Sequence, residues 1–204
     1  MHVLCLDLEG VLIPEIWVSF AEKTGIDALR LTTREVPDYD ELMQGRIKIL
    51  AEHKLGLPEI QEVISTMDPL PGATDFLHSI RQELQLVILS DTFYEFAMPF
   101  MRKLDLPTLF CHRLKVAPNG QITGYQLRQQ DPKRRAVEAL KQLNFRVIAA
   151  GDSYNDTSML GAADFALFFH APENITKQFP QFPCTNTYAE LGARIRSAAA
   201  DFAQ

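Results

Sequence analysis

The sequence predicts an α/β fold, a Rossmann-like parallel sheet with helices on both faces. Short apolar runs at residues 3–6, 84–89, 147–150 and 165–169 alternate with longer helical patterns, which is typical of strands joined by crossover helices. Three of the runs end in polar clusters with the sequences DLEG, SDT and GDSYND. Because ligands of open α/β sheets bind at the carboxyl ends of the strands, we expect these three clusters to meet.

The composition fits a globular protein and excludes several classes of partner. At 204 residues the chain can form one sizeable core and a small additional unit. Its net charge of -6, from 20 basic and 26 acidic residues, argues against nucleic acid as a partner, because binding a polyanion needs a basic surface. The three cysteines are widely spaced and are expected to be reduced. No membrane span and no signal peptide are recognisable, so we expect a cytoplasmic protein without a membrane partner.

A helical cap is predicted between the first and the second strand. Residues 7–83 separate these strands, whereas a simple strand-helix-strand unit takes roughly 30 residues. We therefore predict an α/β core of residues 1–13 and 70–204, and a cap of residues 14–69. Helical patterns within the cap cover 14–25, 38–54 and 58–67, and the return to the core is marked by Pro69, Pro71 and Gly72.

A helix and a hairpin are predicted after the second strand. The helical pattern of residues 92–104 is interrupted by Pro99, which leaves the continuity of that helix open. Residues 113–127 alternate in polarity around the pair Asn119-Gly120, the strongest short-range hairpin signal. We therefore expect an antiparallel ribbon there.

A further helix should begin with Asp131 as its N-cap and Pro132 at its first helical position. Lys133 and the two arginines after it would lie in the first turn, where each cation costs roughly 0.3 to 1 kcal/mol against the helix dipole. An exposed lysine is usually only solvated, but three cations at this position indicate an anion nearby. An amphipathic helix over residues 188–202 is expected to close the chain.

Two pairs of carboxylates suggest a metal site. Asp7 and Glu9 lie two apart at a strand end, so on a continuing strand they would face the same side. Asp152 and Asp156 follow another strand, one helical turn apart. Carboxylates brought together raise one another's pKa unless a cation lies between them, and Mg²⁺ is the economical choice. Ordinary turn residues and helix capping are the alternatives, but they do not require this many acids at two strand ends.

The motifs together resemble those of the haloacid dehalogenase superfamily of phosphohydrolases. DLEGVL is similar to its nucleophile motif, LSDT to its second motif, Lys133 of DPKRR to its third, and GDSYNDTSM to its fourth. Their order and spacing match over essentially the whole chain. Within the superfamily the sequence is similar to the phosphoserine phosphatases, through the cap length, MQGR and GDSYNDTSM. It looks closest to the branch that also transfers phosphate from phosphoserine to homoserine.

This resemblance implies a role for each matching residue. Asp7 would be the nucleophile that forms an aspartyl-phosphate, and Glu9 would protonate the leaving oxygen and then act as the base for the second attack. Ser90 and the backbone N–H of Asp91 would hold a phosphate oxygen, and Lys133 would pair with the phosphate and with Asp7.

The resemblance also implies a Mg²⁺ site. Asp7, the backbone carbonyl of Glu9, and Asp152 would hold the ion, with Asp156 behind them. A carboxylate that attacks a phosphate dianion meets strong repulsion, so positive charge from Mg²⁺ and Lys133 makes sense of the crowded acids.

Two residues depart from the usual phosphoserine phosphatase pattern. Glu9 stands where aspartate is commoner, and Asp91 stands where glycine is usual. An acidic side chain beside the phosphate should disfavour a second anion unless it turns away. This departure puts hydrolysis as the sole activity in doubt. The resemblance to the transferring branch implies homoserine as an alternative acceptor to water.

Substrate handles follow from the same resemblance. Glu15 is expected to bind the amino group, and Arg46 of MQGR the carboxylate, because a bidentate arginine pair suits a carboxylate better than lysine does. The alignment is slack here, so Arg34 or Lys48 could serve instead of Arg46, and Arg46 could simply be a solvated surface residue. Asn155 would contact the substrate or orient Asp156, or else cap a helix.

Other functions remain open. The chain could be a phosphatase of another small phosphomonoester, or a non-catalytic sensor of Mg²⁺ and phosphate, although a sensor would not need both a nucleophile and a general acid. The five histidines are too scattered for a zinc site, and neither a P-loop nor a dinucleotide-binding glycine motif is present. The oligomeric state is left open by the sequence, and an oligomer is compatible with it.

Overall fold

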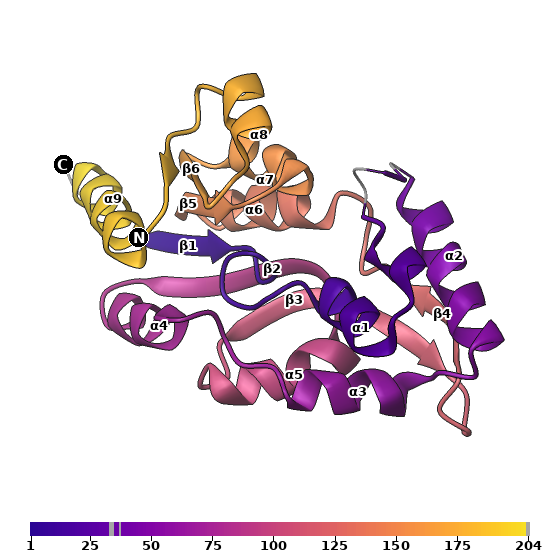
Figure 1. Cartoon of the computed structure of the whole chain (residues 1–204). Helices are drawn as coiled ribbons and strands as arrows, with labels where there is room; N and C mark the ends of the chain where they lie inside the picture. Colours follow the sequence, from indigo (N-terminus) through magenta and orange to yellow (C-terminus); the bar gives the residue numbers. More distant parts are fainter. Residues whose placement is uncertain (33–34, 37, 203–204) are drawn as a thin grey trace.

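A seven-stranded, mostly parallel sheet forms the centre of the structure, a computed structural model that describes residues 1–32, 35–36 and 38–202 (Figure 1). The strand order is β4-β3-β2-β1-β5-β6-β7, in which only β4 runs antiparallel to its neighbour. The predicted α/β class is therefore confirmed. The strands are β1 (His2–Leu6), β2 (Gln85–Phe93), β3 (Thr108–Val116), β4 (Ile122–Gln126), β5 (Arg146–Gly151), β6 (Phe165–Phe169) and β7 (Cys184–Thr185).

Helices cover both faces of this sheet. Side chains alternate along β1, so that Val3 and Cys5 pack on one face, and Leu4 and Leu6 on the other. The first face is covered by α6 (Pro132–Gln142), α7 (Thr157–Ala162) and α8 (Glu173–Gln178). The second is covered by α4 (Ala73–Arg81), α5 (Tyr94–Lys103) and α9 (Tyr188–Asp201). None of the helices in the described ranges combines the length and the apolar character of a bilayer span.

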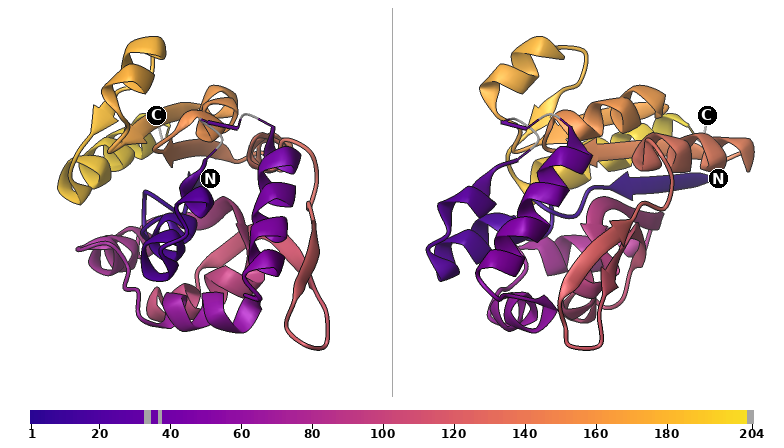
Figure 2. Two further views of the ribbon diagram at one scale, coloured as in Figure 1. Left: turned by 45° about the vertical axis from the view of Figure 1, so that its right-hand side comes forward. Right: turned by 90° about the vertical axis from the view of Figure 1, so that its right-hand side faces the viewer.

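The helices of residues 14–69 gather beyond the carboxyl end of β1 (Figures 1 and 2). Asp38 caps α2 by accepting a hydrogen bond from the N–H of Glu41 at 2.9 Å. The apolar side chains of these helices join the same cluster as one face of the sheet, so the division into core and cap stays a prediction. Their bounds are α1 (Ile16–Thr24), the 3₁₀ helix η1 (Asp27–Arg30), α2 (Tyr39–Glu52) and α3 (Leu57–Ser65).

The predicted hairpin is present and contacts the helices of residues 14–69. β3 and β4 pair in antiparallel register, and Gly120 adopts a φ of 87° in the turn between them. The N–H of Leu57, at the start of α3, donates to the carbonyl oxygen of Gly120 at 2.9 Å. Tyr125 on β4 donates its hydroxyl to Asp40 on α2. The hairpin thus supports two helices of the 14–69 segment.

Three local predictions were wrong or incomplete. β2 does not stop at residue 89 but continues through an irregular register to Phe93. Pro14 lies before α1 and is not its first helical residue, because the helix begins at Ile16 after Glu15 as N-cap. The helix α4 was not predicted from the sequence.

Pro99 lies inside α5 without interrupting it. Proline has no N–H to donate to the carbonyl four residues earlier, which belongs to Glu95. The side chain of Gln61 on α3 donates to that carbonyl oxygen at 3.0 Å instead. A hydrogen bond from another helix therefore compensates for the missing donor and lets the helix continue.

We predict that Gly56→Ala weakens the contact between α3 and the hairpin. A Cβ at Gly56 would lie 2.6 Å from the Gly120 carbonyl oxygen, so the backbone must shift, at a cost of about 1 to 3 kcal/mol in the free energy of unfolding. Gly45→Ala on α2 is the control, because its Cβ meets nothing within 4 Å and alanine favours a helix by about 0.5 to 1 kcal/mol. Urea unfolding measures both, and equal stability of the Gly56 variant and the parent would contradict the expectation.

Candidate active site

The carboxyl ends of three adjacent strands bring the predicted polar residues together. Asp7 follows β1, Ser90 lies on β2, and Asp152 follows β5, with β1 paired to both of the other strands. This is a switch point of the sheet, where open α/β folds bind ligands. Gly10 has a φ of 77°, and a Cβ there would collide with the Asp152 carboxylate, so glycine is required beside the site.

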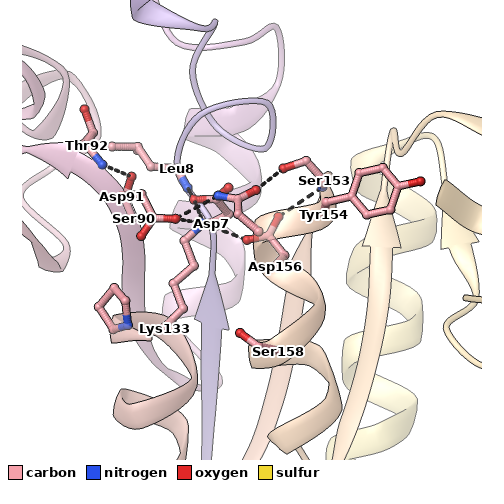
Figure 3. A network of polar contacts seen from close by, with 12 residues as sticks. Asp7, Leu8, Ser90, Asp91, Thr92, Lys133, Ser153, Tyr154, Asp156 and Ser158 are labelled. Carbon is pink, nitrogen blue, oxygen red and sulfur yellow. Dashed lines mark hydrogen bonds and ion pairs between the residues drawn. The ribbon is translucent and has the colours of Figure 1, made fainter. Parts of the chain in front are cut away.

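Lys133 is the centre of the charge cluster (Figure 3). Its ammonium lies 2.9 Å from Asp7 Oδ1, 2.7 Å from Asp156 Oδ1 and 3.6 Å from Asp91 Oδ2, and the residue is only 2% exposed. Burial lowers the pKa of Lys133, but the three carboxylates outweigh it and hold the pKa well above its ordinary value. Lys133 is thus a fixed cation, and the negative charge around it exceeds its own.

Asp156 fixes the loop after β5. Its Oδ2 accepts hydrogen bonds from the N–H groups of Asp152 and Ser153 at 2.9 and 3.1 Å, while Oδ1 faces Lys133. The residue is completely buried at the end of the 3₁₀ turn η2 (Tyr154–Asp156). Both of its oxygens are therefore used within the protein, and its expected place behind the metal ligands stays a prediction.

The acidic side chains form a cluster that could hold a metal ion. One oxygen each of Asp7, Asp152 and Asp156 lies within 4.8 Å of the others. Burial, followed by Asp156, raises the pKa of Asp7, and burial together with Asp156 and Glu15 raises the pKa of Asp152 to about 7. Carboxylate oxygens are the ligands that Mg²⁺ prefers, and a divalent cation would relieve this repulsion. The donor set therefore fits Mg²⁺.

Glu9 lies near the cluster, and the pKa of its carboxyl group is raised. Burial raises the pKa of Glu9, although its Oε2 accepts a hydrogen bond from the N–H of Ile16 at 2.9 Å. Glu15 interacts with Glu9 from the start of α1, and its partly enclosed position and the Glu9 charge raise the pKa of Glu15 as well. A carboxyl group with a raised pKa can carry a proton near neutral pH, as a general acid must.

The polar residues that meet at the strand ends line a cavity of about 380 Å³, among them Asp7, Ser90 and Lys133. Arg46 on α2 lines this cavity as well. Arg46 is 7% exposed, donates through Nη2 to the carbonyl of Leu31 at 2.7 Å, and lies 4.5 Å from the centre of the Trp17 ring. Its buried Nε has no hydrogen-bond partner among the described residues. Arg46 is therefore not a solvated surface residue, and burial lowers its pKa only to about 10.

Of the two alternative cations, Lys48 is not in a comparable position. Lys48 is exposed and lies 3.9 Å from Glu52 on the outer surface of α2. Arg34 lies outside the described residues.

Asp91 does not turn away from the predicted phosphate position. Its Oδ2 accepts a hydrogen bond from Asn155 Nδ2 at 2.8 Å and faces Lys133, while its Oδ1 lies 3.7 Å from His112 Nε2. Lys133 lowers the pKa of Asp91 against the effect of burial, with help from His112 and Asn155. The side chain is therefore an anion inside the site, held by several donors.

Comparison with known proteins decides the family. The sequence model of the haloacid dehalogenase-like hydrolase family matches residues 1–164 of the chain. The chain belongs to the haloacid dehalogenase-like hydrolases. The resemblance seen in the four motifs is thus confirmed.

Curated relatives and solved structures agree with this membership. The hydrolase is 60% identical over 191 residues to the phosphoserine phosphatase ThrH of Pseudomonas aeruginosa, covering 94% of this chain and 93% of that protein. It is 29% identical to the phosphoserine phosphatase of Lactococcus lactis, with 83% of each chain covered. The substrate-bound structure of a phosphoserine phosphatase superposes with a TM-score of 0.75 at 18% identity, over 92% of this chain and 93% of that one, and supports the fold.

Some expectations at the start of α6 of this hydrolase were wrong. Asp131 is at the N-cap position but does not cap the helix, because its φ of 46° is left-handed and its carboxylate accepts from the Ser158 hydroxyl at 2.8 Å. Arg134 and Arg135 do not indicate an anion in the site, since both pair with Glu138 on the same helix, at 2.8 and 3.1 Å. Of the three cations, Lys133 alone points into the cluster.

Two residues of the site were missed in the sequence. Tyr39 donates its hydroxyl to the Asp91 carbonyl oxygen at 2.9 Å, and His112 approaches the Asp91 carboxylate. They lie on α2 and β3, far along the chain from each other, so only the folded arrangement brings them together. Gly10 follows directly after Asp7 and Glu9, so a glycine requirement beside the site could have been read from the sequence.

We predict that Asp156→Ala strongly destabilises the hydrolase. It removes one of the three carboxylates that face the Lys133 ammonium and leaves two N–H groups of the loop without their acceptor, which should cost about 3 to 5 kcal/mol in the free energy of unfolding. Glu173→Ala, which breaks an exposed 2.9 Å ion pair with Lys177, is the control and should cost under about 1 kcal/mol. Similar losses for both variants in chemical denaturation would show that the buried cluster is not stabilising.

Proposed function

We propose that the protein is a Mg²⁺-dependent phosphoserine phosphatase that acts through an aspartyl-phosphate and also transfers the phosphate to homoserine. One observation carries the proposal. A single cavity is lined by Asp7 and Lys133, suited to a phosphate, and by buried Arg46, whose Nε has no partner among the described residues. Such a cavity suits a small molecule with a phosphate and a carboxylate. The 60% identity to a phosphoserine phosphatase over nearly the whole chain supports it.

In the first step, an Asp7 carboxylate oxygen attacks the phosphorus of phosphoserine. A bond forms between that oxygen and phosphorus, the bond from phosphorus to the seryl oxygen breaks, and Glu9 gives its proton to the leaving oxygen. Burial raises the pKa of Glu9, which keeps this proton available. Lys133, 2.9 Å from Asp7, balances the charge on the transferred group together with Ser90 and the Asp91 N–H.

Asp7, the backbone carbonyl of Glu9, and Asp152 would hold Mg²⁺. The crowding of Asp7, Asp152 and Asp156 within 4.8 Å supports a hard divalent ion at this position. When bound, the ion would supply positive charge to the phosphate oxygens.

In the second step, the aspartyl-phosphate is released to an acceptor hydroxyl. Glu9, now deprotonated, removes the proton of water or of the homoserine hydroxyl as its oxygen bonds to phosphorus and the bond to Asp7 breaks. The products are inorganic phosphate or phosphohomoserine. We assign residues 14–69 to a cap whose helices enclose the cavity, because exclusion of water favours transfer to a bound alcohol.

The amino acid part of either substrate would be held by the same groups. Arg46 would bind the carboxylate and Glu15 the amino group, and both residues line the cavity. Asn155 also lines it and, through its hydrogen bond to Asp91, orders the wall near the phosphate.

Phosphorus NMR tests the reaction directly. We predict that the protein, incubated with O-phosphoserine, Mg²⁺ and homoserine, forms both inorganic phosphate and phosphohomoserine. Asp7→Asn should form neither, because an amide cannot act as the nucleophile. Inorganic phosphate as the sole product would contradict transfer, and unreacted phosphoserine would contradict the proposed function as a whole.

A conservative substitution tests the carboxylate handle. Arg46→Lys should raise KM for phosphoserine by roughly tenfold or more, with a smaller change in kcat, because lysine cannot form the bidentate pair. With O-phosphoethanolamine, which has no carboxylate, the same substitution should leave KM nearly unchanged. Lys48→Met, two residues further on α2 but exposed, is the matched control. Equal losses with both substrates would contradict a role for Arg46 in binding the carboxylate.

A further inference from the structure

The proposed reaction leaves the side chains of Asp91, which is partly exposed, and of the buried His112 without a role. His112 on β3 is 2% exposed, and its Nε2 lies 3.7 Å from Asp91 Oδ1. The rings of Tyr39 and Phe93 pack around it with centroids 6.3 Å away. The histidine is thus enclosed in the protein, with one ring nitrogen directed at the Asp91 carboxylate.

The hydrogen bond of the second ring nitrogen shows which nitrogen of His112 carries the proton. His112 Nδ1 accepts a hydrogen bond from the N–H of Arg128 at 3.1 Å. An acceptor nitrogen has no proton, so the neutral ring carries its proton on Nε2, facing Asp91. Asn155 donates to the other carboxylate oxygen at 2.8 Å. Asp91 therefore has a donor directed at each of its carboxylate oxygens.

Asp91 and an incoming phosphate would compete for the same ammonium. Lys133 contacts Asp156 at 2.7 Å and Asp7 at 2.9 Å, whereas its contact with Asp91 is the longest, at 3.6 Å. An ammonium has three protons, and the three carboxylates already face it. A phosphate oxygen at Lys133 must therefore take the place of one of them, and Asp91 is the most weakly held to it.

Space behind Asp91 allows this exchange. A second cavity of about 590 Å³ is lined by Asp91, His112 and Asn155 on the side of Leu127 and Asp131. Asp91 and Asn155 also line the first cavity, so Asp91 borders both cavities. The open space on this side gives its carboxylate room to move off Lys133.

We propose that the Asp91 carboxylate is a placeholder at Lys133 that phosphate displaces, and that His112 is a positioning residue that holds the displaced carboxylate away from the phosphate. The inference rests on the proposed function, because it assigns the phosphate position to Lys133. It gives the departure from glycine at residue 91 a physical role. The anion satisfies the buried ammonium before phosphate arrives, and His112 and Asn155 limit the repulsion afterwards.

Binding of inorganic phosphate, measured by calorimetry on the full chain with Mg²⁺, tests the inference. His112→Phe should raise the phosphate Kd by roughly three- to tenfold, because Asp91 loses a donor and returns to Lys133. His112→Gln, whose amide can donate from a similar position, should restore most of the affinity. Asp91→Asn should lower the Kd, since a competing anion is removed. In the Asp91→Asn background, His112→Phe should have no effect on the Kd.

Two results would overturn the inference. The first is weaker phosphate binding by Asp91→Asn, and the second is an equal effect of His112→Phe in both backgrounds, which would indicate a merely structural role. Circular dichroism checks folding, and Asp91→Asn alone decides the placeholder role if His112→Phe does not fold. Failure of the proposed function is distinguishable, because it would leave phosphoserine unreacted whether or not phosphate binding changes as expected.

Discussion

The site is organised around one ammonium group shared by three carboxylates. Lys133 reaches Asp7, Asp91 and Asp156 from α6, and those acids come from the ends of β1 and β5 and from β2. Bringing these charges out of water is costly unless they balance, so the strand ends, α6 and the η2 turn must be placed together. The fold of the whole sheet edge is therefore tied to this cluster, and a divalent cation would relieve its excess negative charge.

The helices of residues 14–69 add further polar side chains to the cavity at this charged edge. They place Arg46 and Glu15 in the cavity, and the hairpin supports them through Leu57 and Tyr125. In the proposed function, a phosphate released from Asp7 would go to whichever hydroxyl these helices admit to the cavity. In the proposed function, the balance between water and homoserine is therefore set by the fit of the enclosure and less by the reacting groups, which are the same for both acceptors.

The sequence was sufficient to predict the features that are local. The apolar runs predicted the parallel sheet, and the acids directly after them predicted the cluster at its edge, because strand ends converge by topology alone. It could not predict the contacts made across the fold. Gln61 lets α5 continue through Pro99, and His112 approaches Asp91 from another strand. Each depends on side-chain directions that spacing along the chain does not contain.

Thermal unfolding against Mg²⁺ concentration tests most directly whether the cluster needs a divalent cation. Burial and Asp156 raise the pKa of Asp152 to about 7. In the absence of the ion, the Asp152 carboxyl is therefore mostly ionised at about pH 8 and mostly protonated at about pH 5.5. The ion must displace that proton at the lower pH. The account predicts that Mg²⁺ raises the unfolding temperature by several degrees near pH 8, by much less near pH 5.5, and not at all in Asp152→Asn. An unfolding temperature that does not respond to Mg²⁺ near pH 8 would contradict it.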